Sequence, residues 1–198
     1  MKTAFVIFDG MTIMDFIGIY DPLRRLKTMN IVPDFQWNVC ARSAEVVDET
    51  GLRVTPDSVD QSLAGCDLLI VPGGMGTRKL QRDAKFIEWL KTAEGAKIKA
   101  SVCTGALLLG AAGWLKGKRA NTHPNAREEL KPYCAQVVTD RVVDEGNILT
   151  AGGVTSGIDL GLHLVERFAG ADARARVAKQ MDYPYQAAPA TTSDRASV

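Results

Sequence analysis

The sequence predicts an α/β fold: a three-layer, flavodoxin-like sandwich in which a mostly parallel sheet carries helices on both faces. Two observations indicate this fold. Short apolar segments alternate along the chain with segments of helical periodicity. The apolar segments are also too uniformly apolar for one face to meet water, which is typical of parallel strands. The chain has 198 residues. We expect one domain over residues 1–185 and a disordered tail over the small, polar residues 186–198.

The first half of the chain begins with a strand, because residues 2–8 (KTAFVIF) are apolar and partly β-branched and end at Asp9-Gly10. Apolar residues at helical spacing predict a helix over residues 12–29, kinked or restarted at Pro22. The other expected strands of this half are residues 35–41 and 67–71, with short β-like pieces within 43–62.

The second half continues the alternation of strands and helices. A strand is expected at residues 98–102, and two segments flank Asp144-Glu145-Gly146, which predicts a hairpin or a close strand pair. Those segments are residues 137–143 and 147–151. The expected helices are residues 83–93, 104–115, 154–168 and 171–181.

Charge and composition exclude several classes of function. Lys plus Arg number 24 and Asp plus Glu number 23, so the net charge is +1 and predicts no binding to nucleic acid or an anionic membrane. The longest uncharged stretch, residues 100–115, is shorter than a membrane span, and no signal peptide is apparent. We therefore expect a cytoplasmic protein. Four cysteines without a CxxC pair and only two histidines predict no metal site.

Cys103 stands where a strand is expected to turn abruptly into a helix. Small residues two positions away on each side, Ser101 and Gly105, would permit the sharp turn of a nucleophile elbow. The helix N-terminus favours negative charge, so we expect a thiol of lowered pKa that is ionised near neutral pH. A buried structural cysteine is the alternative. The other cysteines, Cys40, Cys66 and Cys134, lack an elbow and are expected to be bystanders.

Glycines follow the strand expected at residues 67–71. Gly73 and Gly74 would let the backbone point its N–H groups at a neighbouring site. Together with the N–H of Thr104, they could form an oxyanion hole beside Cys103. The alternative is a plain strand-ending turn.

Two further residues could act on the thiol. Asp15 stands among apolar residues near a helix start; it is either a helix cap or a desolvated carboxyl group that keeps its proton and serves as a general acid. His123 precedes a helix that can start at Pro124 and could pair with the cysteine, although spacing alone does not bring the two together. His163 lies in an apolar helix stripe and is expected to be structural.

Over residues 3–182 the sequence resembles the ThiJ/PfpI superfamily, which has the class I glutamine-amidotransferase-like fold. The motifs that carry the resemblance are residues 4–10 with Met14-Asp15, 71–74, 101–106, 110–115, 119–123 and 149–159. The Cys-Thr-Gly elbow, the Asp in place of a Glu, and the run Gly152-Gly153-Val154-Thr155-Ser156-Gly157-Ile158-Asp159 are most similar to the isocyanide hydratase branch.

That resemblance implies an enzyme that adds water to an isonitrile and yields an N-substituted formamide through a thioimidate-type intermediate. It implies Cys103 as the nucleophile, Asp15 as the acid and Thr104 as a contact to the thiolate. It also implies no cofactor, a small electrophilic substrate, and a homodimer with the site near the interface. The implied oxyanion- or substrate-binding residues are Gly73, Gly74, Gly153 and Thr155.

Departures from the branch keep two alternatives open. Members of the hydratase branch usually carry Trp after the His, where this chain has Pro124. The Thr-His-Pro run is instead similar to glyoxalase III-type and proposed deglycase proteins, which implies methylglyoxal as substrate and His123 as a proton carrier. The Cys-Thr-Gly motif also occurs in the sensory domains of AraC-type regulators. The chain could therefore be a non-catalytic redox or small-molecule sensor that uses Cys103.

Overall fold

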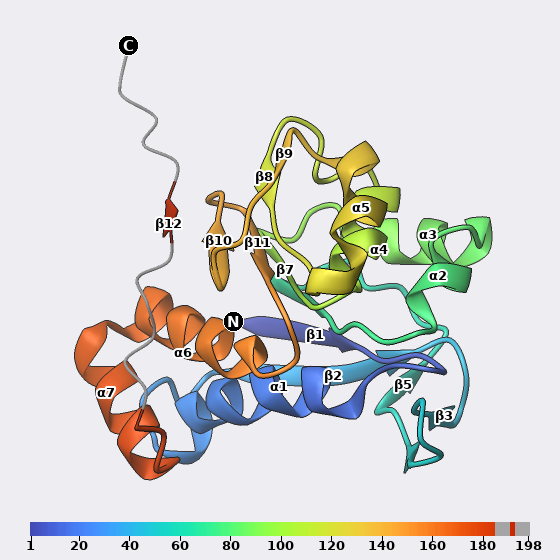
Figure 1. Ribbon diagram of the computed structural model, residues 1–198. Coiled ribbons are helices and arrows are strands. Elements are labelled where there is room, and N and C mark those ends of the chain that lie inside the picture. The colour runs from blue at the N-terminus through green and yellow to red at the C-terminus, as the bar shows by residue number, and fades with distance from the viewer. Residues whose placement is uncertain (185–190, 193–198) are drawn as a thin grey trace.

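The structure is a computed structural model that describes residues 1–184 and 191–192. Its architecture is the predicted three-layer α/β sandwich, with a central sheet between two layers of helices (Figure 1). The predicted tail falls outside the described residues, except for the pair Thr191–Thr192, which forms the short strand β12.

The central sheet has eight strands in the order β12-β10-β11-β7-β6-β1-β2-β5. Neighbouring strands run parallel apart from the antiparallel pair β10 and β11, so the sheet is mostly parallel as predicted. Two strand pairs lie outside it, β3 with β4 and β8 with β9. The strands are β1 Lys2–Val6, β2 Gln36–Ala41, β3 Val46–Val47, β4 Arg53–Val54, β5 Ser58–Val59, β6 Leu68–Val71, β7 Ile98–Val102, β8 Arg119–Ala120, β9 Gln136–Val137, β10 Val142–Asp144 and β11 Ile148–Ala151.

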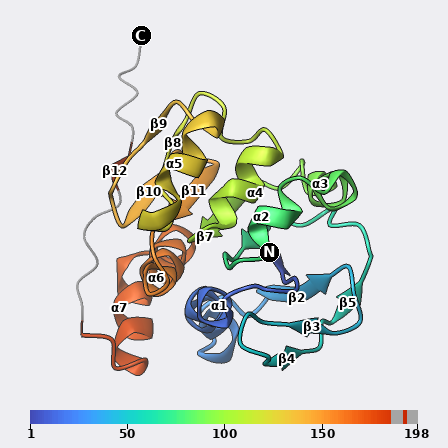
Figure 2. The ribbon, with the colours of Figure 1, turned by 45° about the vertical axis from the view of Figure 1, so that its right-hand side comes forward.

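The helices divide between the two faces of the sheet, as Figures 1 and 2 show from two directions. Helices α1, α6 and α7 pack on one another on one face, while α2, α3, α4 and α5 occupy the other. The α-helices are α1 Ile13–Thr28, α2 Thr77–Leu80, α3 Ala84–Lys91, α4 Gly105–Ala111, α5 Arg127–Leu130, α6 Ser156–Ala169 and α7 Ala171–Gln180, with 3₁₀ turns at Pro124–Ala126 and Lys131–Tyr133.

Three predicted elements differ from the structure. Helix α1 runs through Pro22 without restarting, and Gly161 of α6 leaves the room that the proline ring needs against it. Helix α4 ends at Ala111 rather than at residue 115, since Gly113 adopts a positive φ of 88° soon afterwards. The strand expected at residues 137–143 is split, because Gln136–Val137 pairs with β8 whereas β10 pairs with β11.

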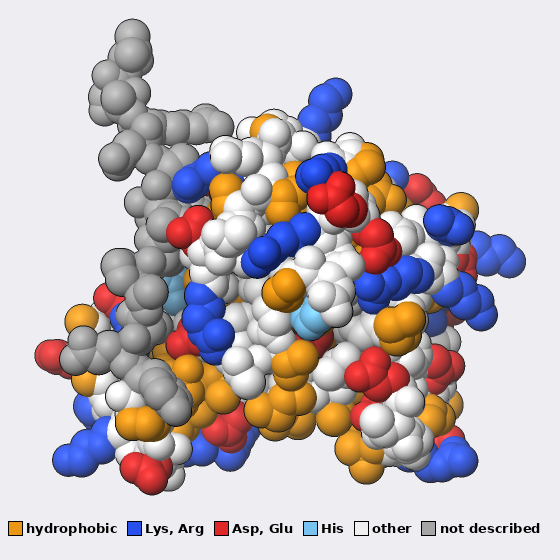
Figure 3. All heavy atoms as spheres, in the orientation of Figure 1, with side chains coloured by type: hydrophobic (Ala, Val, Ile, Leu, Met, Phe, Trp, Pro, Cys, Tyr) orange, Lys and Arg blue, Asp and Glu red, His pale blue; other side chains and the backbone are white. Residues whose placement is uncertain are grey.

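Burial of the central strands on both faces explains their sequence. All four residues of β6 and all four of β11 are buried, which is the burial that the apolar runs predict. On the face shown in Figure 3, basic and acidic side chains are intermingled, in agreement with the near-zero net charge. Within residues 1–184 and 191–192, no helix combines the length and apolar character that crossing a membrane requires.

Candidate active site

Cys103 lies in the sharp connection between β7 and α4, at the carboxyl ends of the parallel strands. Its φ is +55°, an uncommon value for a residue with a side chain and one that marks local strain. Its backbone N–H donates to the carbonyls of Ala151 and Gly152, at 3.1 and 2.9 Å. A side chain at Gly105 would collide with the carbonyl of Val71, so the turn requires a glycine there. The sharp strand-to-helix turn predicted at Cys103 is therefore present.

Asp15 stands in the first turn of α1 with no exposed surface. Its Oδ2 accepts a hydrogen bond of 3.0 Å from the N–H of Gly73, whereas its Oδ1 is buried and has no partner among the described residues. Burial raises the pKa of this carboxyl group from 3.8 to about 6, against a hydrogen bond with Cys103 that lowers it. The structure thus brings Asp15 and Cys103 together, although they are far apart in sequence.

The sequence predicted a lowered pKa for the Cys103 thiol, whereas the structure raises it. Burial and the negative charge of Asp15 raise its pKa to about 12, and hydrogen bonds from Thr104 oppose this only in part. Helix α4 has seven residues, so its dipole is short. Both pKa values are thus raised, because burial disfavours the charged form of either group.

The glycines after β6 position the site rather than form the predicted oxyanion hole. The N–H of Gly73 donates to Asp15, and the N–H of Gly74 donates to Oγ1 of Thr104 at 2.9 Å. The same Thr104 hydroxyl donates to the carbonyl of Gly74 at 3.0 Å. Both amides are therefore occupied. Among the three predicted donors, the N–H of Thr104 remains directed at the sulfur of Cys103.

The missing side chain of Gly73 is a geometric requirement of the site. A Cβ built there would stand 2.5 Å from the nitrogen of Thr104, 2.7 Å from Oδ2 of Asp15 and 2.8 Å from Cβ of Cys103. Real Cβ atoms essentially never approach so closely. The α-carbon of Gly73 therefore lies directly against all three predicted site residues.

His123 and Gly153 lie beside each other. A Cβ on Gly153 would be 3.6 Å from the imidazole Cδ2. Nδ1 of His123 accepts from the N–H of Asn125 at 3.2 Å. Within the described residues the imidazole makes no hydrogen bond to Cys103, so the structure does not form the predicted Cys–His pair in this state.

Thr155 is exposed at the start of α6, where its Oγ1 accepts from the guanidinium of Arg141 at 2.9 Å. Arg141 also pairs with the buried carboxylate of Asp159. The sequence did not predict these contacts of Arg141 with Thr155 and Asp159. It also missed Thr122, whose hydroxyl donates to the carbonyl of Cys103 at 2.9 Å and fixes the elbow. Thr122 belongs to the same motif as His123. Its hydrogen bond to Cys103 could not be predicted, because two residues so far apart in sequence leave no local pattern.

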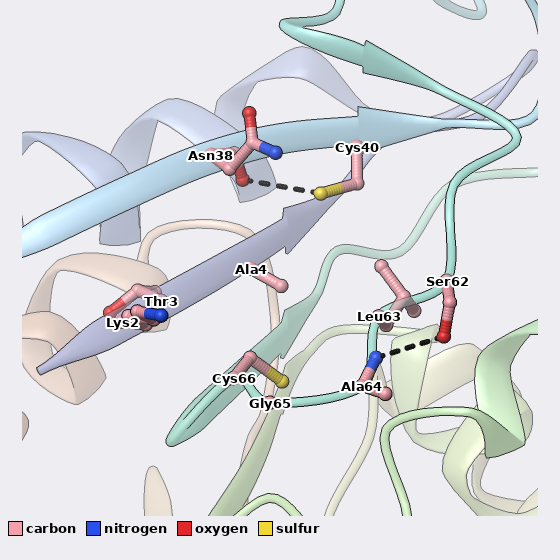
Figure 4. Close-up of a pocket in the computed structure, with 10 residues that line it drawn as sticks. All are labelled: Lys2, Thr3, Ala4, Asn38, Cys40, Ser62, Leu63, Ala64, Gly65 and Cys66. Carbon is pink, nitrogen blue, oxygen red and sulfur yellow. Dashed lines mark hydrogen bonds between the residues drawn. The ribbon is translucent and has the colours of Figure 1, made fainter.

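Among the described residues, neither the remaining cysteines nor His163 forms a hydrogen bond with Asp15 or Cys103. Burial raises the pKa of Cys40, Cys66 and Cys134, that of Cys66 to about 11. Cys40 and Cys66 line a cavity of about 180 Å³ beside the start of β1 (Figure 4). Nε2 of His163 lies 2.8 Å from Oδ2 of Asp144, which is a structural contact. No three His, Cys, Asp or Glu side chains among the described residues are grouped to hold a metal ion.

Known proteins share the sequence and the fold of this chain. Residues 1–167 match the DJ-1/PfpI family. The chain belongs to the DJ-1/PfpI family. A solved ThiJ/PfpI family protein from Pseudomonas syringae superimposes with a TM-score of 0.84 at 29% identity, covering 95% of this chain and 76% of that one.

Two curated relatives within this family differ in what their names state. An isonitrile hydratase of Pseudomonas putida is 36% identical over 199 residues, which cover 100% of this chain and 83% of that protein. The HTH-type transcriptional regulator GbdR of Pseudomonas aeruginosa is 27% identical and aligns with 91% of this chain but 50% of its own length. The DJ-1/PfpI domain thus occurs both as an enzyme and as part of a regulator.

Proposed function

We propose that this DJ-1/PfpI protein is a cysteine-dependent isonitrile hydratase. The observation that carries the proposal is the Asp15–Cys103 pair: a buried carboxylate with one oxygen lacking a partner, set against a thiol that retains its proton. The full-length similarity to an isonitrile hydratase supports the same substrate class. No cofactor is required, because hydration of an isonitrile changes no redox state.

In the first step the thiol adds across the terminal carbon of the isonitrile. Asp15, which is hydrogen-bonded to Cys103, accepts the thiol proton as the sulfur bonds to that carbon. The same proton then passes to the carbon, which yields a thioimidate. The raised pKa of Asp15, about 6, suits a group that must both accept and return a proton near neutral pH.

In the second step Asp15 removes a proton from water, and the water oxygen bonds to the thioimidate carbon. Asp15 returns this proton to the nitrogen. The carbon–sulfur bond of the adduct then breaks, and the hydroxyl proton passes to the departing sulfur as the carbonyl forms. The products are the N-substituted formamide and the Cys103 thiol, so one water is consumed per isonitrile. The N–H of Thr104 faces the sulfur and supports negative charge on it as the bond breaks.

The two alternatives are less well supported by the geometry. A glyoxalase III-type reaction would use His123 as a proton carrier for the thiol, but among the described residues the ring bonds to the N–H of Asn125 and not to Cys103. A redox sensor needs a thiolate of low pKa, whereas the pKa of Cys103 is raised to about 12.

A single-turnover assay with p-nitrophenyl isocyanide, followed by ultraviolet absorbance, tests the proposal. We expect the wild-type protein to produce the formamide. Cys103→Ala should produce none, while Cys134→Ala, which removes a half-buried thiol elsewhere, should match the wild type. Absence of formamide from the wild-type protein, or its retention in Cys103→Ala, would refute the proposed reaction.

The variant His123→Ala separates the hydratase from the glyoxalase reading in the same assay. Because His123 does not bond to the thiol, we expect isonitrile turnover within roughly twofold of wild type. Methylglyoxal is offered to both proteins in parallel. Conversion of methylglyoxal that depends on His123, without isonitrile turnover, would move the assignment to the alternative.

We also propose that the protein is a cytoplasmic homodimer with α1 at its interface. Met14 and Ile17 are 41% and 42% exposed on α1 and flank Asp15. Hydrophobic side chains gather over the region of α1 and α6 on the face in Figure 3. Pairing through this surface would cover apolar area next to the site and exclude water from it.

A further inference from the structure

A second cavity borders the loop that positions Asp15, through Gly76. It has a volume of about 240 Å³ and is bordered by residues that follow β1 and β2 and by helices α2 and α3. These two helices lie next to each other in both ribbon views (Figures 1 and 2). The volume equals the space of roughly eight water molecules at about 30 Å³ each, which suits a small ligand. We refer to it as the α2–α3 cavity.

The floor of the α2–α3 cavity is apolar. Ile7, Phe8 and Phe86 are buried, and Leu80 is half-buried. The rings of Phe8 and Phe86 meet edge to face with centroids 6.0 Å apart. Such a surface favours the apolar body of a ligand, an aromatic ring above all.

The rim of the α2–α3 cavity carries one net positive charge. Arg42 and Lys79 are its cations, and Asp9 is its one carboxylate. Arg42 is already held by Asp60 and the carbonyl of Lys85, and Asp9 accepts from the N–H of Val47. Lys79 is exposed and makes no ion pair or side-chain hydrogen bond among the described residues. Its ammonium group is therefore available to a monoanion.

The loop that borders this cavity also holds the Asp15–Cys103 site. Gly76 lines the cavity, and its N–H donates to the carbonyl of Gly10 at 2.9 Å. Two and three residues earlier, Gly74 and Gly73 bond to Thr104 and Asp15. A molecule in the α2–α3 cavity would thus contact the segment that orients the acid.

From these observations we propose that the α2–α3 cavity is a second ligand site, separate from Cys103, for a small aromatic or aliphatic carboxylate. The apolar floor receives the hydrocarbon part, and the ammonium of Lys79 pairs with the carboxylate. The proposal does not depend on isonitrile turnover, because binding at this site can be measured without a substrate.

Titration with benzoate, followed by tryptophan fluorescence, tests the site. The ring of Trp89 lies 5.4 Å from that of Phe86, so occupancy of the cavity should change its emission. We expect saturable binding with a Kd of about 1 mM or lower. The fluorescence change should be absent in Trp89→Phe and intact in Cys103→Ala. Loss of binding in Cys103→Ala would place benzoate in the proposed active site and overturn the second site.

Charge recognition is tested with Lys79→Met. This variant should bind benzoate roughly tenfold more weakly, whereas Lys116→Met, an exposed lysine that does not line the cavity, should bind as the wild type does. Benzyl alcohol, a neutral analogue, should bind the wild type more weakly than benzoate. Equal binding of benzoate by wild type and Lys79→Met, equal binding of the two compounds, or no binding at all would overturn the proposal.

Discussion

Replacing Asp15 with Asn is expected to lower isonitrile turnover by roughly a thousandfold, the range that general acid–base catalysis contributes. An amide cannot accept the thiol proton or return it to carbon. The variant can still accept the hydrogen bond from Gly73 through its side-chain oxygen, so the loop should stay in place. Turnover rates of purified wild-type and variant proteins measure the effect. Asp21→Asn, which removes a half-buried carboxylate paired with Arg24 and Arg25 on the same helix, should retain activity.

The same substitution should make the protein more stable at neutral pH. A pKa raised from 3.8 to about 6 means that ionised Asp15 costs the folded state about 3 kcal/mol at most. The buried amide NH₂ of the variant offsets part of this gain. The unfolded carboxyl ionises above pH 3.8 and the folded one above about 6, so the cost develops over that range. Asp15→Asn should therefore gain stability at pH 7 and little at pH 4.

Thermal unfolding of the wild-type protein and Asp15→Asn at pH 4 and pH 7 checks the direction of this change in stability. For a chain of 198 residues, 1 kcal/mol shifts the Tm by about 2–4 °C. A lower Tm of Asp15→Asn at pH 7, or an equal gain at both pH values, would contradict the burial cost that we assign to Asp15. Full turnover with raised stability would contradict its role in catalysis.

Replacing Gly73 with Ala is expected to lower turnover by roughly a hundredfold or more and to destabilise the fold by about 1–3 kcal/mol. The added methyl would overlap the nitrogen of Thr104, the carboxylate of Asp15 and Cβ of Cys103. Two of these atoms belong to the turn after β7, which cannot move without displacing the thiol. The loop, the elbow or both must therefore shift.

Gly95→Ala is the matched control for this prediction. No atom lies within 4 Å of the position of its added Cβ, and its φ is not in the left-handed region. It should be neutral or slightly stabilising, because alanine restricts the unfolded chain more than glycine does. Turnover rates and Tm values of Gly73→Ala and Gly95→Ala test this prediction. Wild-type activity in Gly73→Ala would show that the close packing around Cys103 is not required.

Much of the fold and part of the site could be predicted from the sequence. Apolar runs at residues 2–8 and 98–102 predicted β1 and β7, since burial on both faces leaves a continuous apolar signature. The turn at Cys103 was predictable because small residues such as Ser101 and Gly105 are typical of it, although the carbonyl of Val71 is what requires the glycine. The continuity of α1 through Pro22 was not, because Gly161 of a distant helix provides the room.

The sequence by itself thus determined the α/β fold, the elbow and the identity of the candidate nucleophile and acid. Only the tertiary structure decided the direction of the pKa shift of Cys103. Desolvation depends on every neighbour of a group, and here it outweighs the dipole of the short α4 helix. The tertiary structure also turned the amides of Gly73 and Gly74 toward Asp15 and Thr104, and kept the ring of His123 from bonding to the thiol. Local preferences follow from neighbouring residues, whereas these contacts join segments that meet only when the sheet is assembled.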